Sequence, residues 1–269
     1  MSPHLNSSRT KRPFRRESHG GLGRALRTAA SAVAALALLL GWFTATGSAA
    51  YAQESGTPTP TASTTPTAST APAGKAVAVR GGNVIYSSVG TRCTVGFNAR
   101  SGSTYYGLVS GRCAQGATNW YADAALTVFV GTTAGSSFPG NDYALIRYTT
   151  STAVTFPGEV TLGAGGAQDI TGAANPTVGR SLCHVSQVAG VRCGTITAVN
   201  VTINYPEGVV SGLFSSNICS EPGDVGGPAF SGTTALGIIV AGSGSCSSGG
   251  TTFYQPVVEW LSVYGLSLY

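Results

Sequence analysis

The placement of cysteine most restricts how this chain of 269 residues can fold. All six cysteines lie in its later part, at Cys93, Cys113, Cys183, Cys193, Cys219 and Cys246. An even number of cysteines in an exported chain indicates disulfide bonds, and six of them allow fifteen pairings, among which the sequence alone does not choose. A metal site is disfavoured, because no C-x-x-C spacing occurs and His184 is the one histidine after residue 52.

The N-terminus supplies the evidence for export. Seven basic residues precede an apolar run at 29–40, and small residues follow up to Ala50-Tyr51-Ala52. This order is typical of a secretory signal peptide, which we place at residues 1–52. Two points stay open: whether the apolar run is cleaved or retained as a membrane anchor, and whether Arg15-Arg16 directs twin-arginine rather than general secretion.

Residues 53–75 differ sharply in composition from the remainder of the exported chain. They are rich in Thr, Pro, Ala and Ser, lack the apolar residues needed for a core, and predict a disordered linker or a glycosylated stalk. From residue 53 onward, eight Lys or Arg face nine Asp or Glu, so the exported part has a net charge of about −1. Because of this net charge we expect no nucleic-acid partner. From the signal peptide we expect a secreted protein that is either free or associated with the cell wall.

Short β-branched or alternating segments with turn residues between them fill the chain from residue 76 onward, and they predict an all-β barrel or sandwich. The predicted strands are Cys93–Phe97, Tyr105–Ser110, Leu126–Gly131, Tyr143–Tyr148, Val160–Gly163, Gly194–Asn204, Ala235–Val240 and Thr251–Gln255. The end of the chain differs, because apolar residues recur at helical spacing after Pro256 and predict a short helix to about Tyr264.

The segment Cys219–Pro228, CSEPGDVGGP, carries the clearest chemical signal. Its glycines permit backbone conformations that other residues rarely adopt. Such a tight loop can present the N–H groups of Gly223 and Val225 to a carbonyl oxygen, as an oxyanion hole does. Because valine has no hydroxyl group, Val225 itself cannot attack a carbonyl.

This loop resembles the nucleophile loop of chymotrypsin-like serine proteases, in which serine stands in place of Val225. Further segments resemble the streptogrisin and alpha-lytic branch of that family: GGNVIYSS, CTVGFNA, SFPGNDYALIRY and GSCSSGGTTFYQPV. The resemblance implies a domain at 76–269 made of two six-stranded antiparallel β-barrels, at about 79–157 and 158–255, with a C-terminal helix at about 256–265. It also implies the disulfides Cys93–Cys113, Cys183–Cys193 and Cys219–Cys246.

The resemblance also assigns roles residue by residue. The catalytic aspartate of the family matches Asp142, whereas the positions of its histidine and nucleophilic serine hold Arg112 and Val225. The substrate-binding strand matches Val240, Ala241 and Gly242, with Val240 in place of a serine that supports the aspartate. We expect the Arg112 guanidinium to pair with Asp142, because an unpaired buried carboxylate is costly. We also expect His184 and Asp224 to form a structural pair.

Loss of the serine or histidine of such a triad typically lowers kcat about 10⁶-fold. From this we predict that the chain is not an enzyme but a pseudoprotease, a monomer without a cofactor, whose cleft binds peptides or protein protease inhibitors. Two alternatives stay open: a serine-type endopeptidase with atypical chemistry, and a structural cell-surface domain on a glycosylated stalk. After cleavage of the signal peptide we expect no membrane contact.

Overall fold

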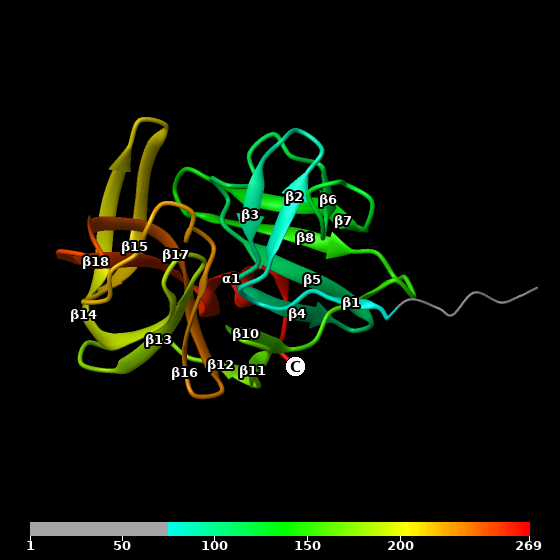
Figure 1. Ribbon diagram of the computed structural model, residues 1–269. Coiled ribbons are helices and arrows are strands. Elements are labelled where there is room, and N and C mark those ends of the chain that lie inside the picture. Colours follow the sequence, from blue (N-terminus) through cyan, green and yellow to red (C-terminus); the bar gives the residue numbers. More distant parts are fainter. Residues whose placement is uncertain (1–74) are drawn as a thin grey trace, which may run out of the picture. The chain divides into compact units, whose positions relative to one another are not determined.

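The computed structural model describes residues 75–269, so the predicted signal peptide at 1–52 and nearly all of the linker at 53–75 lie outside the described residues. Eighteen strands and one helix follow each other (Figure 1). Their bounds are β1 Val77–Ala78, β2 Val84–Ser87, β3 Arg92–Thr94, β4 Phe97–Ser101, β5 Thr104–Val109, β6 Asn119–Tyr121, β7 Phe129–Ser137, β8 Tyr143–Tyr148, β9 Val154–Thr155, β10 Glu159–Gly163, β11 Gly166–Asp169, β12 Gly172–Ala173, β13 Ser181–Ser186, β14 Gly190–Tyr205, β15 Gly208–Ser216, β16 Pro228–Ser231, β17 Thr234–Ser245, β18 Gly249–Pro256 and α1 Val257–Tyr264.

Two seven-stranded sheets confirm the all-β class. The first has the order β3-β2-β6-β7-β8-β5-β4, and its pairings are antiparallel. Its two end strands, β3 and β4, are separated in the chain only by Val95 and Gly96. The sheet therefore has seven strands rather than the predicted six because one bent strand is divided at this point.

The second sheet has the order β12-β17-β16-β13-β14-β15-β18, and β17 also pairs with β18. This extra pairing closes six strands, β13 to β18, into a ring. The seventh strand, β12, is a two-residue segment that joins β17 in parallel. The number of strands in the closed ring thus matches the expectation, and a short added strand accounts for the difference in the sheet.

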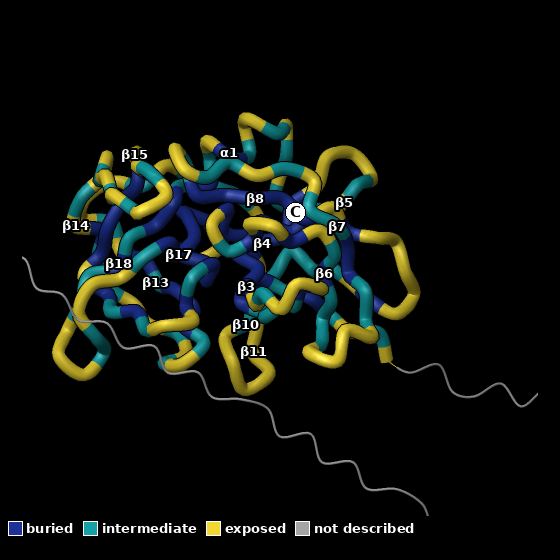
Figure 2. Tube along the Cα trace, turned by 90° about the horizontal axis from the view of Figure 1, so that it is seen from above, coloured by how far each residue is buried: buried dark blue, intermediate teal, exposed yellow. Residues whose placement is uncertain are grey.

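Three apolar clusters form the core. One fills the first sheet around Trp120 and Ile146, another fills the second around Phe214 and Tyr254, and the largest joins both sheets to the helix. Burial follows the strands, whereas the exposed segments lie mainly in the connections between them (Figure 2). The helix α1 begins after Pro256, buries Trp260 fully and ends at Gly265, which confirms the predicted C-terminal helix.

The disulfide bonds join Cys93 to Cys113, Cys183 to Cys193, and Cys219 to Cys246. These are the pairs implied by the family resemblance. Each closes a local loop, and the first and third lie beside Arg112 and the segment 219–228. Within residues 75–269, no helix has the length and hydropathy required to span a bilayer.

Candidate active-site cleft

A cleft of about 400 Å³ brings together most of the positions expected to form a site. Arg112 reaches it from the turn after β5, Val225 from the loop before β16, and Val240 to Gly242 from β17. The remaining lining residues are Tyr205, Ser220, Glu221, Pro222, Ile239 and Gly244. The structure therefore assembles segments that are far apart in the sequence into one concave surface.

Asp142 is fully buried beside this cleft, and two nearby groups donate hydrogen bonds to its carboxylate. Its Oδ1 accepts hydrogen bonds from the Ser110 hydroxyl and from the backbone N–H of Arg112, both at 2.8 Å. Its Oδ2 is buried and has no hydrogen-bond partner within residues 75–269. Burial raises the pKa of Asp142 above its usual value, and the two donors only partly oppose this shift. One carboxylate oxygen is thus left without a donor.

We expect Ser110→Ala to lower the free energy of unfolding by about 2 kcal/mol at pH 7, because a buried carboxylate loses a charge-assisted hydrogen bond. Urea unfolding followed by circular dichroism measures this loss. Ser87→Ala is a matched control, because Ser87 is as buried as Ser110 and its hydroxyl accepts from the backbone N–H of Thr91 rather than supporting a carboxylate. Equal losses in the two variants would contradict a special role for the Ser110–Asp142 contact.

The side chain of Arg112 does not pair with Asp142, and the prediction of that ion pair is wrong. Its Nε lies 3.7 Å from Glu207 Oε1, and its guanidinium lies 4.9 Å from the centre of the Tyr205 ring. The side chain is 44% exposed, so the guanidinium keeps much of its hydration while it packs on an aromatic face. From Arg112, Asp142 receives the backbone N–H alone.

Tyr205 connects this arginine to the substrate-binding strand predicted from the sequence. Its hydroxyl donates to the backbone carbonyl of Val240 over 3.3 Å, and its ring packs edge-on against Phe138. Burial raises the pKa of Tyr205 to about 12, with a smaller contribution from the nearby negative charge of Asp142, so the hydroxyl remains a donor at neutral pH. Arg112 and Tyr205, which pack on each other, both line the cleft.

The loop 219–228 is anchored by its own aspartate. The buried carboxylate of Asp224 accepts the backbone N–H groups of Gln187 and Glu221, each at 2.8 Å. Gly223 and Gly226 have φ angles of 104° and 93°, and a Cβ at Gly226 would lie 2.4 Å from the Thr94 carbonyl oxygen. Glycine is therefore required for the loop to pack against β3.

Two donors on this loop are available to a ligand. Asp224, Gly226 and Gly227 donate their backbone N–H groups to carbonyls at Glu221, Ile239 and Asp224. Within the described part of the chain, the N–H groups of Gly223 and Val225 have no such acceptor. These are the two groups expected from the sequence to form an oxyanion hole.

His184 does not form a hydrogen bond with Asp224, so the predicted pair is corrected. Its Nδ1 lies 2.8 Å from the Tyr254 hydroxyl, which also contacts Ser216, whereas Asp224 is occupied by backbone donors. Burial lowers the pKa of His184 to about 4, although the negative charge of Asp224 opposes the shift. At neutral pH the His184 side chain is thus uncharged and buried on β13, and it does not line the cleft.

The cleft is bordered by an unpaired strand edge. On one side, β17 pairs with β16 only as far as Ile238, whereas its other side pairs with β18 up to Ser245. Residues 240–244 therefore leave one edge open, and Gly242 to Gly244 are exposed there. Such an edge can accept an additional strand through backbone hydrogen bonds.

Within residues 75–269, no group of three or more His, Cys, Asp or Glu side chains is arranged to bind a metal ion.

Comparison with known proteins identifies the family. Serine protease 2 of Streptomyces fradiae is 47% identical over 176 residues, which cover 65% of this chain and all of that protein. The chain belongs to the streptogrisin and alpha-lytic branch of the chymotrypsin-like serine proteases. Streptogrisin-D of Streptomyces griseus is 45% identical over 71% of this chain. The solved structure of alpha-lytic protease homolog N4 has 55% identity and a TM-score of 0.68, and it covers 72% of this chain and 100% of its own.

The extent of these matches differs between relatives. The chain spans 48% of the length of streptogrisin-D, about half of that relative. No family model matches the chain.

The prediction that the chain is not an enzyme is contradicted by these relatives. Proteins at 45% and 47% identity carry the names of serine proteases or streptogrisin, and the chain is placed within a protease family. The prediction gave two side chains, Arg112 and Val225, more weight than the identity of the whole domain. The family assignment from the sequence motifs is confirmed.

Several residues of the site were not identified from the sequence. Ser110, Tyr205, Glu207 and Gln255 all contact the residues that were identified, and Gln255 accepts the backbone N–H of Asp142 at 2.9 Å. Ser110 stands two residues before Arg112, so a polar residue at the end of a buried strand was an available signal. Tyr205 and Glu207 lie at the tip of the β14–β15 hairpin, and no local sequence pattern predicts that this tip lies next to Arg112.

Proposed function

We propose that the cleft binds extended peptide segments, either substrate-like chains or the exposed loops of protein protease inhibitors. The observation that carries this proposal is the open edge of β17 at 240–244, which borders the same cleft as Val225, whose backbone N–H has no acceptor among the described residues. A peptide that adds to this edge gains backbone hydrogen bonds, and one of its carbonyl oxygens lies within reach of the loop. The protein acts as a secreted monomer.

Binding of a fluorescently labelled tetrapeptide and of a protein inhibitor of streptogrisin-type proteases tests this proposal on the full chain. Ala241→Trp fills the cleft and should weaken binding of both at least about tenfold. Val263→Trp is the matched control, because Val263 is 59% exposed on α1 and outside the cleft. Lack of binding by the natural chain at millimolar concentration, or equal binding by both variants, would refute the proposal.

We expect Tyr205→Phe to strengthen peptide binding by about three- to tenfold. An incoming peptide competes with the Tyr205 hydroxyl for the Val240 carbonyl, and such a hydrogen bond contributes about 1 kcal/mol. The same peptide titration measures the change. Tyr106→Phe, on β5 and outside the cleft, should leave the affinity unaltered. Weaker binding by Tyr205→Phe would mean that the hydroxyl contacts the ligand instead.

Peptide hydrolysis is a second candidate function, favoured by the relatives named as serine proteases. Val225 offers no hydroxyl, and Arg112 has no nitrogen that accepts a proton. Ser220 is the residue of the cleft lining that carries a hydroxyl on the loop. Treatment with a fluorophosphonate probe, followed by mass spectrometry of the labelled peptide, tests this function. A covalent adduct on Ser220 supports it, and an unlabelled protein that cleaves no peptide removes it.

A further inference from the structure

A second pocket, of about 560 Å³, lies on the first sheet and shares no residue with the cleft. It is formed by the start of β5, the end of β8, the connection from Thr149 to Pro157, and Tyr269. Its size is within the range of small-molecule sites in proteins, roughly 300–1,000 Å³. Neither the family motifs nor the proposed peptide binding uses this pocket.

Aromatic rings form its walls. Tyr148 and Phe156 stack with their ring centres 3.7 Å apart and their planes 7° apart. Tyr105 and Tyr269 meet edge to face at 5.2 Å, and Tyr105 is 38% exposed. Hydroxyl groups hold two of the four rings in place, since Tyr148 donates to Asn98 and Tyr269 donates to the Phe156 carbonyl. The ring of Tyr105 remains accessible.

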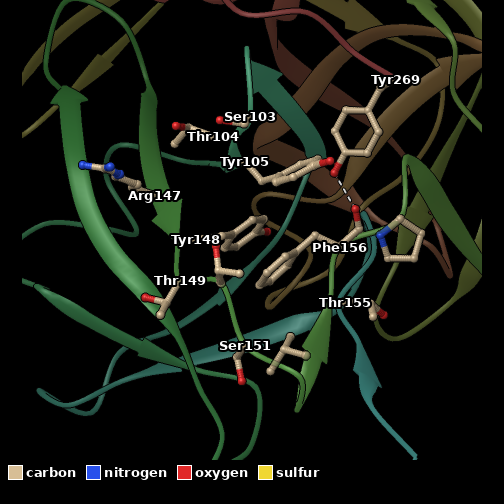
Figure 3. A pocket seen from close by; sticks show the side chains of 13 residues that line it. Ser103, Thr104, Tyr105, Arg147, Tyr148, Thr149, Ser151, Thr155, Phe156 and Tyr269 are labelled. Atoms are coloured by element: carbon tan, nitrogen blue, oxygen red, sulfur yellow. Dashed lines mark hydrogen bonds between the residues drawn. The ribbon is translucent and has the colours of Figure 1, made fainter.

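Hydroxyl groups surround these rings. Figure 3 shows Thr149, Ser151 and Thr155 around the central group of rings, with Ser103 and Thr104 on another side. Ser151 accepts the backbone N–H of Ala153. Within residues 75–269 the other lining Ser and Thr side chains make no hydrogen bond, so their hydroxyls can both donate to and accept from a ligand.

Few charged side chains lie near the pocket. Arg147 is the one lining residue with a charged side chain, and Figure 3 shows that its guanidinium extends away from the rings. The guanidinium of Arg100, which does not line the pocket, lies 5.4 Å from the centre of the Tyr269 ring. A charged ligand would therefore gain little to offset the loss of its hydration. The chemistry instead suits a neutral molecule that has an apolar face and many hydroxyl groups at its edge.

From this arrangement we propose that the pocket binds a neutral oligosaccharide, with one sugar ring packed on Tyr105. A pyranose ring presents C–H groups on its face, which pack on an aromatic ring, and hydroxyls around its edge, which pair with Ser and Thr. Proline-rich peptides also use aromatic-lined grooves, but they do not require a ring of unpaired hydroxyls. The site is independent of peptide binding in the cleft.

Saturation-transfer NMR and calorimetry on the full chain test this with three neutral probes: cellotetraose, maltotetraose and the tetramer of N-acetylglucosamine. We expect at least one of them to bind with Kd at or below about 1 mM. Tyr105→Ala should weaken binding at least about tenfold, whereas Tyr105→Phe should retain it because the ring remains. Tyr86→Ala, on β2 and outside the pocket, is the control for loss of a tyrosine.

Ala241→Trp separates this site from the cleft, because it should weaken peptide binding at least about tenfold and leave the sugar affinity unchanged. Circular dichroism confirms that each variant is folded. The proposal is overturned if none of the three probes binds at about 10 mM, a concentration that detects even very weak complexes. It is also overturned if Tyr105→Ala binds as well as the natural chain, or if a Pro-Thr repeat peptide contacts Tyr105 while the sugars do not.

Discussion

The combined variant Arg112→His, Val225→Ser and Val240→Ser should hydrolyse a short chromogenic peptide with kcat/KM at least about 10³ above that of the natural chain. A Ser–His–Asp unit needs a nucleophile, a base and an orienting carboxylate at the same time. The buried Oδ2 of Asp142, which lacks a partner among the described residues, is suited to accept the N–H of the introduced histidine. The N–H groups of Gly223 and Val225 would stabilise the developing oxyanion.

Each single substitution should change the rate less than about tenfold, because the members of such a unit act together. Adding Asp142→Asn to the combined variant is the control, and it should lower kcat about 10⁴-fold by favouring the wrong histidine tautomer. The hypothesis that these three substitutions complete a Ser–His–Asp unit with Asp142 fails if the combined variant is folded and binds peptide, yet cleaves it no faster than the natural chain.

Acid should destabilise the fold through His184 by about 3 kcal/mol. Its pKa is about 4 in the folded protein, against 6.5 as its ordinary value, and each pKa unit corresponds to about 1.4 kcal/mol. Because the unfolded chain binds the proton more readily, this stability is complete above pH 6.5. It is lost as the pH falls from 6.5 to about 4. Urea unfolding at several pH values in this range measures the slope.

His184→Asn provides the comparison, because its amide can still meet the Tyr254 hydroxyl but does not titrate. Asp142 acts in the opposite sense, since its raised pKa gives stability at low pH that is lost as the pH rises. That contribution is present in both proteins and cancels in the difference. Identical pH slopes for the natural chain and His184→Asn would contradict the assignment.

The family was predictable from the sequence because short motifs carry it, and the all-β class and the C-terminal helix were predictable because they follow from the spacing of apolar residues. The loop 219–228 needs glycine for its backbone and Asp224 for its anchoring, so its geometry is encoded locally. The disulfides followed from the family resemblance rather than from spacing, since fifteen pairings were open.

Side-chain partners were less predictable, because they depend on surroundings contributed by distant segments. Arg112 was expected to meet the buried Asp142, but the hairpin tip between β14 and β15 offers Tyr205 and Glu207 instead. His184 was expected to meet Asp224, but Tyr254 on β18 supplies its partner. In both cases the carboxylate was already satisfied, at least in part, by backbone N–H groups, which a sequence pattern does not reveal.

Amide chemical shifts of the full chain during titration with an unlabelled tetrapeptide test most directly whether the cleft binds an extended chain. We predict that the N–H signals of Gly223, Val225 and Gly242 shift together and saturate at the same peptide concentration. Shifts confined to residues outside the cleft, or no shift of these three signals at saturating peptide, would contradict it.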